Sequence, residues 1–190
     1  MESGSRGALA DGLLQAGCIR FGEFTLKSGL QSPIYIGLRR LVSHPVLLAA
    51  VARAYLPLLE PLKFDRLAAL TYAALPIATA ISLPGSWPLV YPRKEVKAHG
   101  TSRQVEGEYE SGDRAVVLDD LITTGGSKLA AIEPLEAAGL AVRDVVVLID
   151  REEGGRQDLA DKEQAEIDVQ IGEAVERALQ LVHQAHLLVV

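Results

Sequence analysis

The chain has 190 residues, which is enough for one sizeable domain and short for two. Hydrophobic residues make up 48% and charged residues 23%, as in ordinary globular proteins, and the formal net charge of -6 argues against a general nucleic-acid binder. Cys18 is the only cysteine, which excludes an intramolecular disulfide, and the apolar stretches end well before the roughly 20 residues that a membrane span needs. We expect a cytoplasmic protein with a single domain over residues 1–190, without a signal peptide or a membrane segment.

Segments typical of helices and strands alternate along the chain. Residues 21–40, FGEFTLKSGLQSPIYIGLRR, follow a helical lead-in near Leu9–Ala16 and predict short strands and turns. Apolar runs that predict strands lie at Arg66–Thr71, Trp87–Tyr91, Ala115–Leu118, Val142–Ile149 and Ile167–Ile171. Helices are predicted at Pro45–Leu59, Pro76–Leu83, Ser127–Ala138 and Glu173–His183. Pro134 should kink the third of these helices, which Gly139 ends.

This alternation predicts an α/β fold with a mostly parallel central sheet flanked by helices. In such sheets, ligands bind at the carboxyl ends of the strands. The loops that follow Leu70, Tyr91, Leu118 and Ile149 should therefore converge on one site. Residues 92–112 lack helical and strand periodicity and are interpreted as a polar loop.

The segment VVLDDLITTGGS, residues 116–127, combines an apolar strand, two acids and a loop rich in Thr and Gly. Its glycines allow the backbone to approach a ligand closely, and the N–H groups at a helix start favour phosphate. Because Asp119 and Asp120 would repel a phosphate, they should face sugar hydroxyls or a magnesium ion. The alternative interpretation is an ordinary strand–turn–helix junction that Ser127 caps.

A basic segment, YPRKEVKAHGTSRQVEG, occupies residues 91–107. Between Arg93 and Arg103 it holds four Arg or Lys residues together with His99. Cations in this number can stabilise the charge on a departing diphosphate, and the glycines of the segment could hinge a loop closure. The alternative is a solvated charged loop.

Two further segments carry candidate base-binding residues, FGEFTLKSG with SPIY near the N-terminus and LIDREEGG at the end of a predicted strand. The planar guanidinium of Arg151 matches a carboxylate in two hydrogen bonds, so it suits a substrate that carries one. Alternatively, Arg151 pairs with Asp150 or Glu152 at the surface. The acidic stretch Asp158–Asp168 is interpreted as an exposed face.

Together, these motifs resemble those of the type I phosphoribosyltransferases. Residues 116–127 resemble their motif for PRPP (5-phosphoribosyl 1-diphosphate), and the string R-K-x-x-K-x-H-G resembles the catalytic loop of the orotate phosphoribosyltransferases in particular. FGEFTLKSG, SPIY and D-R-x-x-G-G also resemble that family, so the likeness runs from about Phe21 to Gly155. It implies the type I phosphoribosyltransferase fold, with a small hood formed by N-terminal segments and a flexible catalytic loop.

The same resemblance implies an enzyme that transfers ribose 5-phosphate from PRPP to orotate in pyrimidine (UMP) biosynthesis, with Mg²⁺ as cofactor. The implied catalytic residues are Lys97, Asp119 and Asp120. The residues implied to bind PRPP are Lys27, Tyr72, Arg93, Lys94, Lys97, His99, Asp119, Asp120, Leu121, Ile122, Thr123, Thr124, Gly125, Gly126 and Ser127. Those implied to bind orotate are Lys27, Tyr35, Thr123 and Arg151. Mg²⁺ would be held mainly through PRPP, close to the two acids.

The family also implies a homodimer that shares the catalytic loop across its interface, and an association with orotidine 5′-phosphate decarboxylase is a further expectation. One segment departs from the family pattern, because Ala69 stands where a glycine is usual and Thr71 where proline or alanine often stands. If the backbone there needs a positive φ, Ala69 would be strained. Two alternatives follow. A phosphoribosyltransferase for another base conflicts with Arg151, whereas this departure supports a non-catalytic PRPP-binding regulator.

Overall fold

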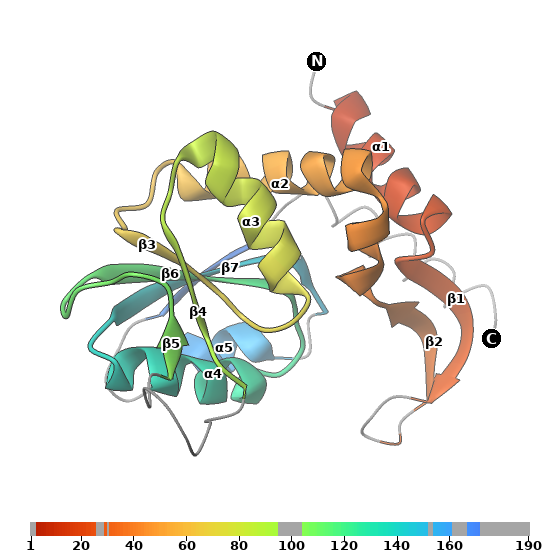
Figure 1. Ribbon diagram of the computed structural model, residues 1–190. Helices are drawn as coiled ribbons and strands as arrows, with labels where there is room; N and C mark the ends of the chain where they lie inside the picture. The colour runs from red at the N-terminus through yellow and green to blue at the C-terminus, as the bar shows by residue number, and fades with distance from the viewer. Residues whose placement is uncertain are drawn as a thin grey trace. The chain divides into compact units, whose positions relative to one another are not determined.

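The computed structural model describes residues 3–25, 29, 31–94, 104–151, 154–160 and 167–171 (Figure 1). The chain divides into two compact units, one of Met1–Val51 with Glu173–Val190 and one of Ala52–Gly172. Each unit has its own β-sheet. The single domain over residues 1–190 stays a prediction. Within the described ranges, no helix is both long and apolar enough to cross a membrane.

The N-terminal unit is built on a β-hairpin. Its elements are α1 (Ser3–Gln15), β1 (Ile19–Thr25), β2 (Gln31–Ile36) and the 3-10 helix η1 (Leu38–Ser43). β1 and β2 are antiparallel, and Arg20 lies opposite Tyr35 with its guanidinium carbon 4.8 Å from the centre of the tyrosine ring. A cation over an aromatic face is attracted by the ring quadrupole. The helical lead-in and the short strands predicted for this region are confirmed.

A six-stranded sheet with the order β5-β4-β3-β6-β7-β8 forms the second unit. Its strands are β3 (Arg66–Ala69), β4 (Leu89–Pro92), β5 (Val105–Glu106), β6 (Arg114–Ile122), β7 (Ala141–Asp150) and β8 (Asp168–Ile171). All pair in parallel except β5, which is antiparallel to β4. The mostly parallel sheet is confirmed, and the carboxyl ends of β3, β4, β6 and β7 lie at one edge, as predicted.

Helices cover both faces of this sheet. They are α3 (Ala74–Gly85), α4 (Gly126–Ala137) and α5 (Gly155–Ala160), while α2 (Pro45–Leu59) runs from the first unit into the second. α4 and α5 lie on one side and α3 on the other (Figure 1). On the α4 side, Ile132, Leu135 and Leu159 form one buried cluster with Val117 and Val145 of the sheet. Each such side chain stabilises the fold by about 1.5–3 kcal/mol when it is fully buried, so this cluster holds α4 and α5 against one face of the sheet.

Three elements differ from the sequence-based prediction. β6 continues through Asp119 and Asp120, so both acids lie within the strand and not after it. β5 lies in the expected polar loop, because two residues are enough to pair with β4 but too few to show a period. α5 was not predicted either, because its six residues are too few to show a helical period. Pro134 lies inside α4, where a kink stays a prediction, and the helix predicted at Glu173–His183 falls outside the described residues.

Candidate functional site

Two half-buried acids and a buried lysine form a charged group near the carboxyl end of β6. Lys128, in the first turn of α4, places its Nζ 2.5 Å from Oδ2 of Asp119, and the two side chains are 7% and 13% exposed. The buried Tyr55 of α2 donates a hydrogen bond from its hydroxyl to the backbone carbonyl of Asp119 at 2.8 Å. Burial, and then the charges of Asp120 and Asp119, raise the pKa of Tyr55, so its hydroxyl keeps the proton that it donates. Asp119 is therefore held through both its side chain and its backbone.

Asp120 has a strongly altered proton affinity. Its Oδ1 accepts a hydrogen bond from the backbone N–H of Leu121 at 2.9 Å. Burial, followed by the charge of Asp119, raises the pKa of Asp120 from 3.8 to about 7, and Lys128 opposes this rise. Asp120 is therefore partly protonated near neutral pH, while Lys128 forms an ion pair with the adjacent Asp119.

The backbone that leaves β6 is hydrogen-bonded to the backbone that leaves β7. The N–H of Arg151 donates to the carbonyl of Ile122, and the N–H of Gly155 donates to the carbonyl of Thr123, each at 2.9 Å. A Cβ on Gly155 would lie 2.5 Å from the Thr123 carbonyl oxygen, so the two chains meet at a distance that only glycine allows. The segment expected to bind the base thus lies against the loop expected to bind phosphate.

Asp158 of α5 makes a third link between these segments. Asp158 is exposed, as the sequence predicted, and its Oδ2 also accepts a hydrogen bond from the backbone N–H of Gly125 at 2.9 Å. A Cβ on Gly125 would lie 2.5 Å from the Cβ of Asp158, so this contact also requires glycine. Gly125 is the residue before α4, which begins at Gly126. Ser127 is therefore not the helix cap of the alternative interpretation, and its side chain lies outside the described residues.

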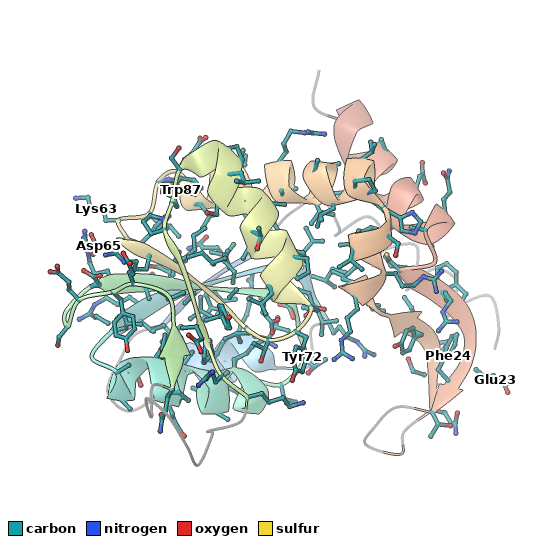
Figure 2. All side chains as sticks on the ribbon, viewed as in Figure 1. Glu23, Phe24, Lys63, Asp65, Tyr72 and Trp87 are labelled. Carbon is teal, nitrogen blue, oxygen red and sulfur yellow. The ribbon has the colours of Figure 1, made fainter. Side chains whose placement is uncertain are left out.

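Lys94 and Tyr72 lie together at the carboxyl edge of the sheet. Nζ of Lys94 is 5.3 Å from the centre of the Tyr72 ring, and Tyr72 is 56% exposed in the loop between β3 and α3 (Figure 2). Arg93 has a different partner, because its Nε is 2.6 Å from Oε1 of Glu106 and its backbone N–H donates to the carbonyl of Gln104. Arg93 therefore fastens the start of the basic segment to its end, while the ammonium of Lys94 lies over an exposed ring.

The segment that departs from the family pattern has no unusual φ. Ala69 is fully buried in β3, and Ser86 is the one described non-glycine residue with a positive φ. The strain considered for Ala69 is therefore absent, because the position is extended and accepts a Cβ. The peptide bond between Thr71 and Tyr72 is cis.

The structure brings most of the predicted PRPP residues to one edge. Those at the end of β6 and the start of α4 are Asp119, Asp120, Leu121, Ile122, Thr123, Thr124, Gly125 and Gly126. Arg151 directly follows β7 and is half-buried. Tyr35, which is 41% exposed, belongs to the N-terminal unit. Lys27, Lys97 and His99 lie outside the described residues.

Metal-binding capacity at this edge is limited. Within the described part of the chain, no three His, Cys, Asp or Glu side chains are grouped as a metal site would require. Asp119 and Asp120 have the oxygen ligands that Mg²⁺ prefers, but the carboxylate of Asp119 is already paired with Lys128. These residues fit a cation that brings most of its own ligands, and they do not form a protein cage.

Sequence reasoning missed Lys128, Asp158 and Tyr55. One feature of the sequence could have indicated the role of Lys128. A cation in the first turn of a helix opposes the helix dipole, so it is favourable there only beside an anion. Its side chain should also point back toward the residues before the helix, where the two acids lie. Asp158 and Tyr55 act through contacts over 33 and 64 residues of sequence, which no local pattern shows.

Three comparisons bear on this site. A model of the phosphoribosyl transferase domain matches residues 38–179. The bifunctional enzyme PyrF/PyrE of Nostoc is 44% identical over 142 residues, which are 75% of this chain and 30% of that protein. Orotate phosphoribosyltransferase of Pyrococcus furiosus is 42% identical over 147 residues, 76% of this chain and 81% of the relative. The crystal structure of orotate phosphoribosyltransferase from Aeropyrum pernix superposes with a TM-score of 0.77 at 32% identity, covering 90% of this chain and 98% of that one.

The first prediction concerns the raised pKa of Asp120. The folded protein keeps a proton on Asp120 that the unfolded chain releases between about pH 4 and pH 7, so the free energy of unfolding should fall as pH rises through this range. Asn cannot titrate. Without Mg²⁺, D120N should therefore gain at least about 1 kcal/mol over the wild type between pH 4.5 and pH 8, measured by urea unfolding. The exposed control E133Q should follow the wild type, and a pH profile of D120N parallel to the wild type would refute the assignment.

The second prediction concerns Asp158. D158A removes the acceptor for the Gly125 N–H and should lower the free energy of unfolding by about 1–2 kcal/mol. D158N keeps an acceptor oxygen in the same place and should lose less than half as much. Hydrogen exchange at the Gly125 amide, followed by NMR, should speed up in D158A and change little in D158N. Equal behaviour of the two variants would mean that the contact does not act as a hydrogen bond.

Proposed function

This chain belongs to the phosphoribosyl transferase domain family, and on that basis we propose that it is an orotate phosphoribosyltransferase of pyrimidine (UMP) biosynthesis. In the proposed reaction, orotate and PRPP give orotidine 5′-phosphate and pyrophosphate. One observation carries the proposal. Arg151, suited to a substrate carboxylate, follows β7 directly, and its backbone is hydrogen-bonded to the end of β6, next to the acids and the glycine loop.

The identity of the base depends on Arg151. Orotate carries a ring carboxylate, and a guanidinium binds a carboxylate through two parallel hydrogen bonds. A neutral pyrimidine or purine offers no such group. Thr123 begins the adjoining loop, so a base held by Arg151 would lie beside the residues proposed to hold the ribose phosphate. Tyr35 and Lys27 are proposed as further base contacts.

The chemistry we propose is a displacement at the anomeric carbon of PRPP. A bond forms between a ring nitrogen of orotate and C1 of the ribose, and the proton of that nitrogen is released to water. The C1–O bond to the diphosphate breaks, and its electron pair leaves with pyrophosphate. Backbone N–H groups at the start of α4 would hold the 5-phosphate, and Asp119 and Asp120 would accept hydrogen bonds from the ribose hydroxyls. Positioning and charge stabilisation then supply the catalysis.

The cations of the basic segment are proposed to bind the leaving group. Lys94 lies at the carboxyl edge beside Tyr72, and Lys97 and His99 follow it in the chain. Arg93 contributes less directly in this proposal, because its guanidinium is paired with Glu106. Lys97 is proposed as the main catalytic cation, since positive charge placed where the diphosphate develops charge lowers the barrier.

Mg²⁺ is proposed as the cofactor, carried mainly by oxygens of PRPP. When bound, it would neutralise diphosphate charge and so assist departure of pyrophosphate. Among the described residues at this edge, Asp119 and Asp120 have the carboxylate oxygens that Mg²⁺ prefers, although Lys128 is already paired with Asp119.

We also propose which partners this chain has. The chain spans 30% of the bifunctional Nostoc relative, so that relative contains a further part which this chain does not match. This supports an association with orotidine 5′-phosphate decarboxylase, the proposed next enzyme. A homodimer that shares the basic segment, and a cytoplasmic location, are proposed on family grounds.

Orotate consumption, followed spectrophotometrically with PRPP and Mg²⁺ and with or without EDTA, tests the proposal. Loss of orotate that requires PRPP is the expected result, and inhibition by EDTA would support the cofactor. Turnover of uracil or a purine in place of orotate would identify a transferase for another base. PRPP binding without any turnover would identify a regulator, the alternative that the departures at Ala69 and Thr71 favour. For Ala69 the argument from strain is removed, because its φ is not positive.

A variant prediction addresses Lys97. K97A should lower kcat by about a hundredfold or more, because it removes a cation aimed at the charge that develops on the diphosphate. Its melting temperature and circular dichroism should match the wild type. K63A, at an exposed lysine between α2 and β3, serves as the matched control and should keep full activity. An unchanged kcat in K97A would remove Lys97 from its proposed role.

A further inference from the structure

Lys128 is a buried cation in a position that is unfavourable without a partner. The residue is 5% exposed, and lysine is rarely buried to this degree unless it is paired. It also stands in the first turn of α4, where the positive end of the helix dipole opposes an ammonium. The contact of 2.5 Å between its Nζ and Asp119 compensates for both costs. Lys128 is therefore part of the acidic site and not a surface residue that happens to be close.

The ammonium changes what the acidic pair can bind. Without Lys128, two adjacent carboxyls at a strand end would attract a divalent cation. With Lys128, one carboxylate is neutralised, and a second cation would have to approach a fixed ammonium with little water to screen the repulsion. Sugar hydroxyls face no such barrier, since they are neutral and donate to carboxylate lone pairs that the ammonium leaves unoccupied.

Asp119 is also fixed in position by these contacts. Lys128 holds its Oδ2, and Tyr55 holds its backbone carbonyl. A carboxylate held at two points loses little conformational freedom when a ligand arrives, which strengthens binding. Because Lys128 is buried and paired with Asp119 through contacts within the chain itself, it can prepare the site for a ligand.

We propose that Lys128 is a positioning residue that holds Asp119 ready for the ribose hydroxyls of PRPP and keeps a free divalent cation away from the acidic pair. Magnesium would then enter together with PRPP and not before it. The inference rests on the proposed function for the identity of the sugar ligand, but its claim about free cations does not require catalysis.

The first test measures melting temperature with and without 10 mM MgCl₂, in the absence of PRPP. The wild type and K128R should show no shift beyond the ionic-strength effect of matched NaCl. K128M, which keeps the length of the side chain and removes its charge, should be stabilised by Mg²⁺ by at least about 3 °C, since a cation that binds only the folded state raises the melting temperature. The exposed control K63M should behave as the wild type.

The second test separates positioning from mere stability. K128M should raise KM for PRPP by about tenfold while KM for orotate stays within about twofold, the loss expected from one charge-assisted contact. K128R should recover most of the loss. A K128M variant that is only less stable, with no response to Mg²⁺ and an unchanged KM for PRPP, would overturn the proposal.

A measurement on the wild type decides the case even if K128M does not fold. Isothermal titration of Mg²⁺ into the wild type without PRPP should show no binding. Binding that D119N abolishes would overturn the proposal, because it would place a free cation at the acidic pair. Neither the thermal shift nor the titration needs turnover. A failed orotate assay would therefore count against the proposed function only, and these two measurements would still test the exclusion of free cations.

Discussion

β6 and β7 pair in parallel from Arg114 opposite Ala141 to Ile122 opposite Asp150, and the arrangement of the site depends on this register. The hydrogen bonds continue beyond the strands, through the Arg151 and Gly155 amides, so the two loops leave the sheet as a connected pair. A shift of one residue would turn every side chain of β6 to the opposite face and separate the acids from Lys128. The burial of Val117 and Val145 under α4 and α5 fixes the register. Core packing and site geometry are therefore set by the same strands.

A chain with a net charge of -6 must use local means to hold an anion. At this edge the proposed means are mostly backbone N–H groups and glycines, with few full charges. The Gly125 N–H serves a structural role instead, because it donates to Asp158, and the close approach of α5 excludes any side chain at Gly125. The half-buried acids would repel phosphate, but Lys128 balances the charge of Asp119 internally. The candidate site thus has groups that attract an anion and groups that attract a cation within a few residues of each other in the sequence.

The sequence predicted those parts of the fold whose information is local. Apolar runs marked β3, β6 and β7, because buried parallel strands have continuous hydrophobic stretches, and Pro45 marked the start of α2. The Asp-Asp and Gly-Gly pairs marked the edge that carries the candidate site. Prediction failed where stability comes from distant partners, as in the two residues of β5, which exist as a strand only against β4. The partner of Lys128 required knowledge of where α4 begins, and the role of Asp158 required the packing of α5 on the phosphate loop.

The hydrogen bonds between the segment after β7 and the loop after β6 limit how base specificity can diverge on this scaffold. An insertion or deletion between Arg151 and Asp158 would shift Gly155 and Asp158 away from their partners. It would therefore disturb the loop proposed to bind phosphate along with the segment proposed to bind the base. Replacement of the Arg151 side chain leaves those backbone links intact. New substrates are therefore reached most easily by exchanging side chains on a fixed backbone, and libraries aimed at other bases should vary identity at this segment and preserve its length.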